Sequence, residues 1–227
     1  MINIYFLEWG KNRSKKHNHY NRIHGMRIFE LIFSKKLTDI GVELEIFKEI
    51  NIYFLANPEK PISYEENLAF KEINIFVPED LMKFLKLKST EAKFQGFSEL
   101  VYKFIVPAIE KYSAIPFPEI LANTNRALNE VINQDYQAVF LVDKTPKKSP
   151  DQEKFAILKG IHDSEGFQLR CEVYNKRGLR IINQLLVEEV GNEVIYSKFF
   201  GELKWLSEHL IIVSSNSSDW KTTIHVS

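Results

Sequence analysis

Three histidines near the start of the chain have a spacing that would suit a metal ion. His17 and His19 lie two residues apart, and His24 lies five residues beyond His19. On an extended segment two such imidazoles can meet one metal ion, and a third can close the site. No Asp or Glu lies between Lys11 and Arg27, so the carboxylate that usually supports a metal-binding histidine is not local. We therefore favour a solvated polar loop here, with a metal-assisted hydrolase or nuclease as the alternative.

The other reactive residue types argue against an assembled catalytic centre. The nine glycines are scattered and form neither a Walker nor a dinucleotide-binding loop, and no Gly-x-Ser-x-Gly sequence occurs. Cys171 is the single cysteine, which excludes an internal disulfide and a zinc site built on paired cysteines. Its alternating apolar neighbours are typical of an inert core thiol. We expect no catalytic residue and no cofactor.

Residues 11–36 form a basic segment. They contain eight Lys and Arg against a single acid, Glu30. Such a segment can contact phosphates, which leaves open a nucleic-acid-associated module built on Lys15, Lys16, Arg22 and Arg27. The whole chain, however, carries thirty Lys and Arg against thirty Asp and Glu. Because a dedicated non-specific nucleic-acid binder needs a cationic surplus, nucleic acid is not the partner that we expect.

Residues 42–54 alternate in the way that predicts a strand with one apolar and one acidic face, and this length leaves room for a bulge or turn near Lys48 and Glu49. The apolar parity, which only Lys48 interrupts, consists of Val42, Leu44, Ile46, Ile50, Ile52 and Phe54. Carboxylates steer a basic partner and aromatic rings supply contact area. We therefore predict a partner-binding surface on the other face of this strand together with the 11–24 loop. It consists of Glu43, Glu45, Phe47, Glu49 and Tyr53 of the strand and Tyr20 of the loop. The alternative is a solvated face, or one covered by the helix predicted at 97–112.

An α+β fold would position these residues. Alternation at 2–6, 42–54 and 73–77 predicts antiparallel N-terminal strands, whereas 26–37 fits a helix and also tolerates a strand. Central helices are expected over about 78–133. The strongest of them spans 97–112, where Ser98 is the expected N-cap and Pro107 must kink or end the helix.

The C-terminal third predicts an antiparallel β-meander. Turn residues recur about every ten positions between alternating segments. These segments are marked by Tyr136 to Val142, by Phe155, Ile157 and Ile161, and by Phe167 to Val173. An exposed loop at 144–150 separates two predicted lobes, 1–143 and 154–227, and a single continuous domain is the alternative.

The sequence favours a cytoplasmic protein that does not enter a membrane. The N-terminal residues lack the basic leader, long apolar block and small-residue cleavage site of a signal peptide. Nowhere do eighteen apolar residues follow one another, so no membrane-spanning helix is expected. A lone cysteine suits a reducing compartment.

Two stretches, residues 97–108 (FSELVYKFIVPA) and residues 196–205 (YSKFFGELKW), resemble bacterial immunity proteins that neutralise polymorphic or contact-dependent growth-inhibition toxins. The resemblance implies a small, cytosolic and catalytically empty protein that binds one toxin domain and blocks its active site. It carries over no functional residue. The expected activity is stoichiometric inhibition of a cognate toxin domain through shape and charge complementarity.

Overall fold

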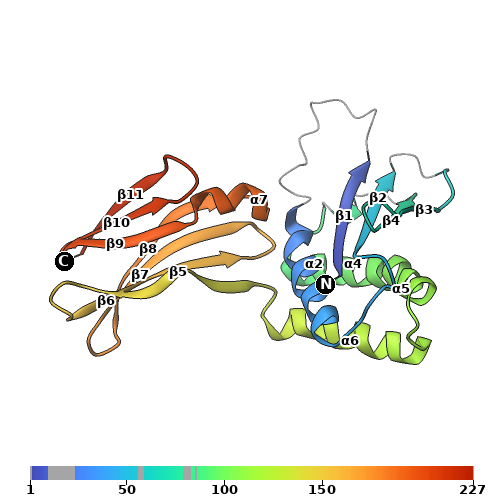
Figure 1. Ribbon diagram of the computed structural model, residues 1–227, viewed down its shortest axis with the longest axis horizontal. Helices are drawn as coiled ribbons and strands as arrows, with labels where there is room; N and C mark the ends of the chain where they lie inside the picture. Colours follow the sequence, from blue (N-terminus) through green and yellow to red (C-terminus); the bar gives the residue numbers. More distant parts are fainter. Residues whose placement is uncertain (1, 10–23, 56–58, 79–82, 85, 227) are drawn as a thin grey trace. The chain divides into compact units, whose positions relative to one another are not determined.

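The computed structural model describes residues 2–9, 24–55, 59–78, 83–84 and 86–226, and it has the predicted α+β architecture (Figure 1). The chain divides into two compact units, Met1–Gln137 and Ala138–Ser227, which we call the N-terminal and C-terminal units. The boundary predicted at residues 144–153 is thus misplaced. Those residues belong to the C-terminal unit, because the strand that begins at Ala138 continues to Lys148.

The N-terminal unit contains a four-stranded sheet in the order β1-β2-β4-β3. Its strands are β1 (Asn3–Trp9), β2 (Glu49–Leu55), β3 (Ser63–Asn67) and β4 (Glu72–Val77). β1, β2 and β4 run parallel, and only β3 is antiparallel to its neighbour. The prediction of antiparallel pairing was wrong because helix α2 (Arg27–Asp39) connects β1 to β2. A helical crossover of this kind joins parallel strands.

Several helical segments pack against the apolar face of this sheet or against one another. They are α2, α4 (Thr90–Leu100), the π-helical turn η2 (Val101–Ile105), α5 (Val106–Tyr112) and α6 (Phe117–Asn133). Phe97 of α4 is fully buried at the centre of the packing. Its ring lies 5.6 Å from Phe6 of β1, and 5.7 Å and 5.8 Å from Phe29 and Phe33 of α2. The core of the unit is therefore an aromatic cluster between sheet and helices.

The helix predicted at 97–112 is longer and interrupted. It begins at Thr90, because the Ser89 side chain caps it by accepting a hydrogen bond from the Ala92 amide at 3.1 Å. The predicted cap, Ser98, lies inside the helix and donates its hydroxyl hydrogen to the Phe94 carbonyl at 2.9 Å. The wide turn η2 ends at Ile105, two residues before Pro107, where the sequence predicts a kink.

The C-terminal unit consists of two antiparallel sheets. The first is the predicted meander of β5 (Ala138–Lys148), β6 (Lys154–His162), β7 (Phe167–Asn175) and β8 (Arg180–Glu189). After the short helices α7 (Glu193–Tyr196) and η3 (Ser197–Phe199), a second sheet contains β9 (Gly201–Ser207), β10 (Leu210–Ser215) and β11 (Lys221–His225). Most of the predicted loop at 144–150 is strand β5, which has a register shift between Val142 and Lys147.

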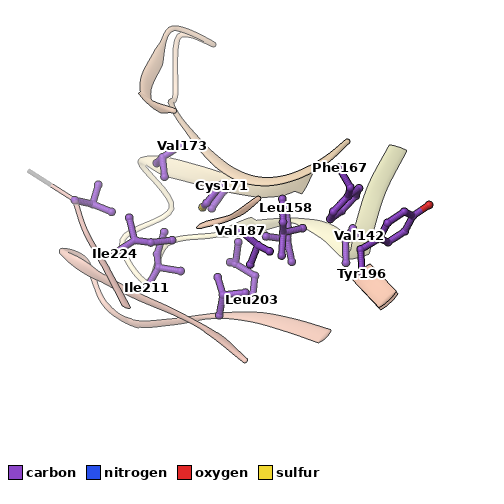
Figure 2. Close-up of a cluster of buried hydrophobic side chains, with 14 residues drawn as sticks. Val142, Leu158, Phe167, Cys171, Val173, Val187, Tyr196, Leu203, Ile211 and Ile224 are labelled. Atoms are coloured by element: carbon purple, nitrogen blue, oxygen red, sulfur yellow. The ribbon is translucent and has the colours of Figure 1, made fainter. Parts of the chain in front are cut away.

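The core of the C-terminal unit lies between its two sheets. Figure 2 shows Leu203, Ile211 and Ile224 of the second sheet pointing towards Leu158, Cys171 and Val187 of the first. Tyr196 closes one end of this core, where its ring stacks on Phe167 at 4.0 Å. The Leu203 backbone N–H donates to the Asp143 carboxylate at 3.3 Å, which ties β9 to the irregular part of β5.

Candidate functional site

The predicted acidic strand face does not exist as one surface. Strand β2 begins only at Glu49, and the chain before it turns, with an isolated bridge between Leu44 and Phe47. Glu45 has a left-handed backbone (φ 42°), so alternation stops there. Phe47 is buried with its ring 5.2 Å from Tyr112. Glu43 and Glu45 are exposed in this turn, apart from the residues of β2.

Two of the predicted residues, Glu49 and Tyr53, do share a face of β2, on the parity opposite the buried apolar residues. Their register partners on β4 are Glu72 and Phe76. The rings of Tyr53 and Phe76 stack at 5.1 Å with an interplanar angle of 16°. Between these pairs, the Asn51 side-chain amide donates to the Asn74 side-chain oxygen at 3.0 Å. The result is a polar and aromatic ladder across two parallel strands.

The electrostatics of this ladder are acidic. Burial raises the pKa of the Tyr53 phenol, and the carboxylates of Glu72 and Glu49 raise it further. The phenol therefore stays protonated at neutral pH. A shallow hollow of about 360 Å³ lies next to the ladder. It is lined by Leu55, Lys60, Pro61, Ser63, Glu65 and Phe76. Its mixed lining contains one hydroxyl, one carboxylate and one ammonium group, which is not an assembled catalytic set.

The histidine cluster falls mostly outside the described residues. His17, His19 and Tyr20 are not among them, and His24 begins the short 3₁₀ helix η1 (His24–Met26). Among the residues that the structure describes, no three His, Cys, Asp or Glu side chains are grouped to hold a metal ion. The metal-assisted alternative therefore stays a prediction.

The described part of the basic segment is engaged within the N-terminal unit. The Arg27 guanidinium donates to the Glu30 carboxylate at 2.8 Å and lies 4.4 Å from the centre of the Tyr5 ring. Glu30 also accepts from the Phe6 backbone N–H at 3.1 Å, so this pair joins α2 to β1. Lys15, Lys16 and Arg22 lie outside the described residues. The nucleic-acid alternative stays a prediction for those three.

The C-terminal unit presents a surface that the sequence analysis missed. We call it the outer face, meaning the parity of the β5–β8 sheet that points away from the core. Register pairs such as Leu141 with Lys159 and Arg170 with Leu185 define it. It consists of Val139, Leu141, Phe155, Ile157, Lys159, Ile161, Gln168, Arg170, Glu172, Tyr174, Arg180, Asn183, Leu185 and Glu188.

Apolar residues are unusually frequent on this outer face. The face of an antiparallel sheet that points to solvent normally carries polar residues. Here Val139, Leu141 and Leu185 are exposed, with Leu141 keeping 54% of its surface accessible. The Phe155 and Tyr174 rings stack at 5.1 Å across β6 and β7. These residues give the sheet apolar area on both sides.

A charged network occupies the centre of the outer face. The Glu172 side chain is only 3% exposed, and its carboxylate lies 3.4 Å from the Lys159 ammonium and 3.2 Å from the Arg180 guanidinium. The Tyr174 hydroxyl donates to it at 2.5 Å. Burial opposes ionisation, but the Tyr174 hydrogen bond and the two cations outweigh it, and they lower the pKa of Glu172. The carboxylate is therefore charged at neutral pH.

The sequence did not predict the outer face because β6 carries apolar residues on both of its faces. Phe155, Ile157 and Ile161 marked this strand, yet the fully buried residues are Ala156 and Leu158. The sequence did contain an indication of the outer face, because apolar residues occupy positions on both faces of β6. Only the register with β7 shows which parity faces the core.

Cys171 is an inert core thiol, as predicted. It is fully buried in the core of the C-terminal unit and forms no disulfide. Burial, with a smaller contribution from Glu172, raises the pKa of the thiol to about 12. The thiolate that a nucleophile requires is therefore absent at neutral pH.

Comparisons with known proteins gave no similarity from which to argue. No family model, curated protein or solved structure matches the chain. None of the helices in the described ranges combines the length and apolarity that crossing a bilayer requires.

Proposed function

We propose that this chain is a non-catalytic binding protein that receives a partner protein on the outer face of its β5–β8 sheet. The observation that carries the proposal is the composition of that face, where exposed aliphatic residues surround a charged and aromatic centre. Protein interfaces are enriched in Tyr, Phe and Arg, and binding energy concentrates where such residues are desolvated. Tyr174, Phe155 and Arg170 are of these types.

The charge of the outer face defines the chemistry of the partner. Lys159 and Arg180 contact the carboxylate of Glu172, which has little exposed surface, and Arg170 is a third cation of this face. Arg170 is held in place by Asn183 at 2.8 Å and by Gln168 at 2.9 Å. A complementary partner presents apolar side chains with carboxylates around them, because opposed potentials steer the encounter.

A toxin domain is the partner class that we favour. This choice rests on the resemblance of residues 97–108 and 196–205 to bacterial immunity proteins. In this proposal the chain acts in the cytoplasm and occludes the active site of one cognate toxin in a stoichiometric complex. The mechanism is exclusion of substrate by a bound surface, so it requires no bond-making group on this chain.

Calorimetric titration tests the proposal. The probe is the toxin domain encoded by the gene adjacent to that of this protein. We expect Leu141→Lys to weaken binding by about 30-fold, the effect of losing about 2 kcal/mol, because it places a charge among the apolar residues that surround the centre of the outer face. Leu206→Lys is the matched control, because Leu206 is 57% exposed but belongs to β9 of the other sheet. The control should bind as the wild type does.

Two outcomes would contradict the proposal. Absence of binding at micromolar concentration would remove the toxin-binding function. Equal affinity of the wild type and Leu141→Lys would remove the outer face as its location. Glu49→Lys belongs in the same titration, since Glu49 represents the surface predicted on β2. Loss of binding in Glu49→Lys alone would transfer the interface to the N-terminal unit and refute the outer face.

A further inference from the structure

Strand β8 is an edge of the first sheet in the C-terminal unit. Among the described strands it pairs only with β7, so the hydrogen-bonding groups along its other side have no strand partner. Proteins usually protect such edges with Pro, Lys or inward charges. The segment Ile181–Val187 (IINQLLV) contains no charged residue, no Pro and no Gly. Ile181 and Leu185 within it are exposed.

The opposite edge of the same sheet is built differently. β5 carries Pro146 followed by Lys147 and Lys148, and its ladder is interrupted after Val142. These features are the usual protection against pairing with another chain. The contrast between the two edges indicates that β8 is left open for a strand.

We propose that β8 pairs with β8 of a second copy of this chain, antiparallel and centred on Gln184. In such a pair residue i lies opposite residue 368 − i, an offset that follows directly from placing Gln184 opposite itself. Opposite residues must point to the same side of the sheet. Arg180 and Glu188 both lie on the outer face, as do Asn183 and Leu185. The side chains of these two pairs therefore agree in direction about Gln184.

Charge complementarity selects this register. It places Arg180 of each copy opposite Glu188 of the other, so the dimer contains this pair twice. Arg180 also contacts Glu172 within its own chain at 3.2 Å. Glu188 is exposed, and it forms no ion pair with another residue that the structure describes. Shifting the centre by two residues, to Ile182 or Leu186, would separate these opposite charges.

The irregular positions of β8 limit the segment that pairs. The register with β7 shifts between Val173 and Tyr174 and between Leu169 and Arg170, near the two ends of the strand. Ile182–Leu185 keeps regular pairing with β7 between these shifts, and the part of it that is symmetric about Gln184 is Asn183–Leu185. The Arg180–Glu188 pairs lie beyond the shifts, at the two ends of this short ladder. A pairing core this short gives a reversible dimer. In it the two first sheets become continuous, and both outer faces lie on the same side. The inference does not depend on what the outer face binds.

Sedimentation equilibrium of the full chain over a range of concentrations tests the dimer. We expect a reversible dimer whose dissociation constant rises at least tenfold in Glu188→Arg, because arginines then face each other twice. Glu208→Arg is the matched control, since Glu208 is an exposed glutamate in the turn after β9. A protein that stays monomeric up to millimolar concentration overturns the proposal, and so does a dimer that Glu188→Arg leaves intact.

Charge exchange and cross-linking test the register itself. Mixing Glu188→Arg with Arg180→Glu should restore association, because every opposed pair in the mixed dimer has opposite charges. Circular dichroism checks that Arg180→Glu folds beside Glu172. Gln184→Cys supplies a second readout that leaves both charges in place. Cysteines opposite each other across antiparallel strands lie within disulfide reach, so mild oxidation should link two copies. Leu206→Cys should not link, and failure of Gln184→Cys to link while a dimer exists excludes the β8 pairing.

Discussion

Replacing Glu172 by glutamine should destabilise the C-terminal unit in a pH-dependent way. The carboxylate is 3% exposed and contacts Lys159, Arg180 and Tyr174. Removing one partner from a fully buried ion pair costs about 3–5 kcal/mol. The Lys159 and Arg180 side chains are 26% and 49% exposed, so water screens both charges once the carboxylate is gone. We therefore expect Glu172→Gln to lower the free energy of unfolding by about 2 kcal/mol at pH 7.

The pH dependence has a definite sign. The pKa of Glu172 is lower in the folded protein than in the unfolded chain. Its stabilisation is thus fully present above about pH 4.3, the ordinary value for glutamate, and is lost as the pH falls through the lowered pKa. At low pH the protonated wild type resembles the glutamine variant. The difference in melting temperature of the C-terminal unit should be about 8–16 °C at pH 7 and should shrink as the pH falls below about 4.3.

Thermal unfolding of both proteins at several pH values provides the assay. Glu153→Gln is the control, because Glu153 pairs with Lys176 at 2.8 Å on an exposed surface, where ion pairs contribute little. Its melting temperature should match that of the wild type at every pH. A Glu172→Gln difference that does not shrink as the pH is lowered stepwise below about 4.3 would refute the electrostatic reasoning.

Three further changes have expected outcomes. Phe97→Ala leaves a cavity at the centre of the N-terminal core and should lower the free energy of unfolding, measured by chemical denaturation, by about 3–5 kcal/mol. Gly201→Ala would place a Cβ 1.9 Å from the Ser214 carbonyl oxygen, so backbone must move, and we expect a loss of about 1–3 kcal/mol. Iodoacetamide at pH 8 should leave Cys171 unmodified in the native protein and alkylate it in urea; native labelling would contradict its burial and its pKa of about 12.

The meander of the C-terminal unit could be predicted because its alternation and its turns agree. Phe167, Leu169, Cys171 and Val173 alternate with polar residues, and all four are fully buried. Asn175–Gly178 then supplies the turn, with Gly178 in a left-handed conformation (φ 77°) that glycine adopts without strain. In this meander the strands and turns that the local sequence predicts are the ones that the packed core requires.

The N-terminal sheet shows where a pattern is insufficient. Ile4 and Ile50 occupy buried positions that an antiparallel or a parallel sheet would fill equally well. Direction depends on the connection, and residues 26–37 fit both a helix and a strand. Strand β3 has no buried residue, so periodicity gave no indication of it.

The candidate sites depended on information that alternation does not contain. The acidic surface predicted over 42–54 failed at Glu45, where a left-handed residue starts a turn in place of a strand. The outer face needed the register of β6 with β7, since Phe155 and Ala156 are both apolar and only the second is buried. When both faces of a strand are apolar, its pairing with distant strands determines which face is exposed.

The parallel pairing of β1 with β2 also affects how the protein is made. Asn3 pairs with Glu49 and Trp9 with Leu55, so β1 cannot complete its pairing with β2 until residue 55 has been synthesised. During that interval α2 is the element that can cover Ile2 and Phe6, and until it forms these residues contact water or a chaperone. Slowing translation within this stretch should lengthen the interval and increase aggregation of the nascent chain, whereas the hairpins of the C-terminal unit can close as they emerge.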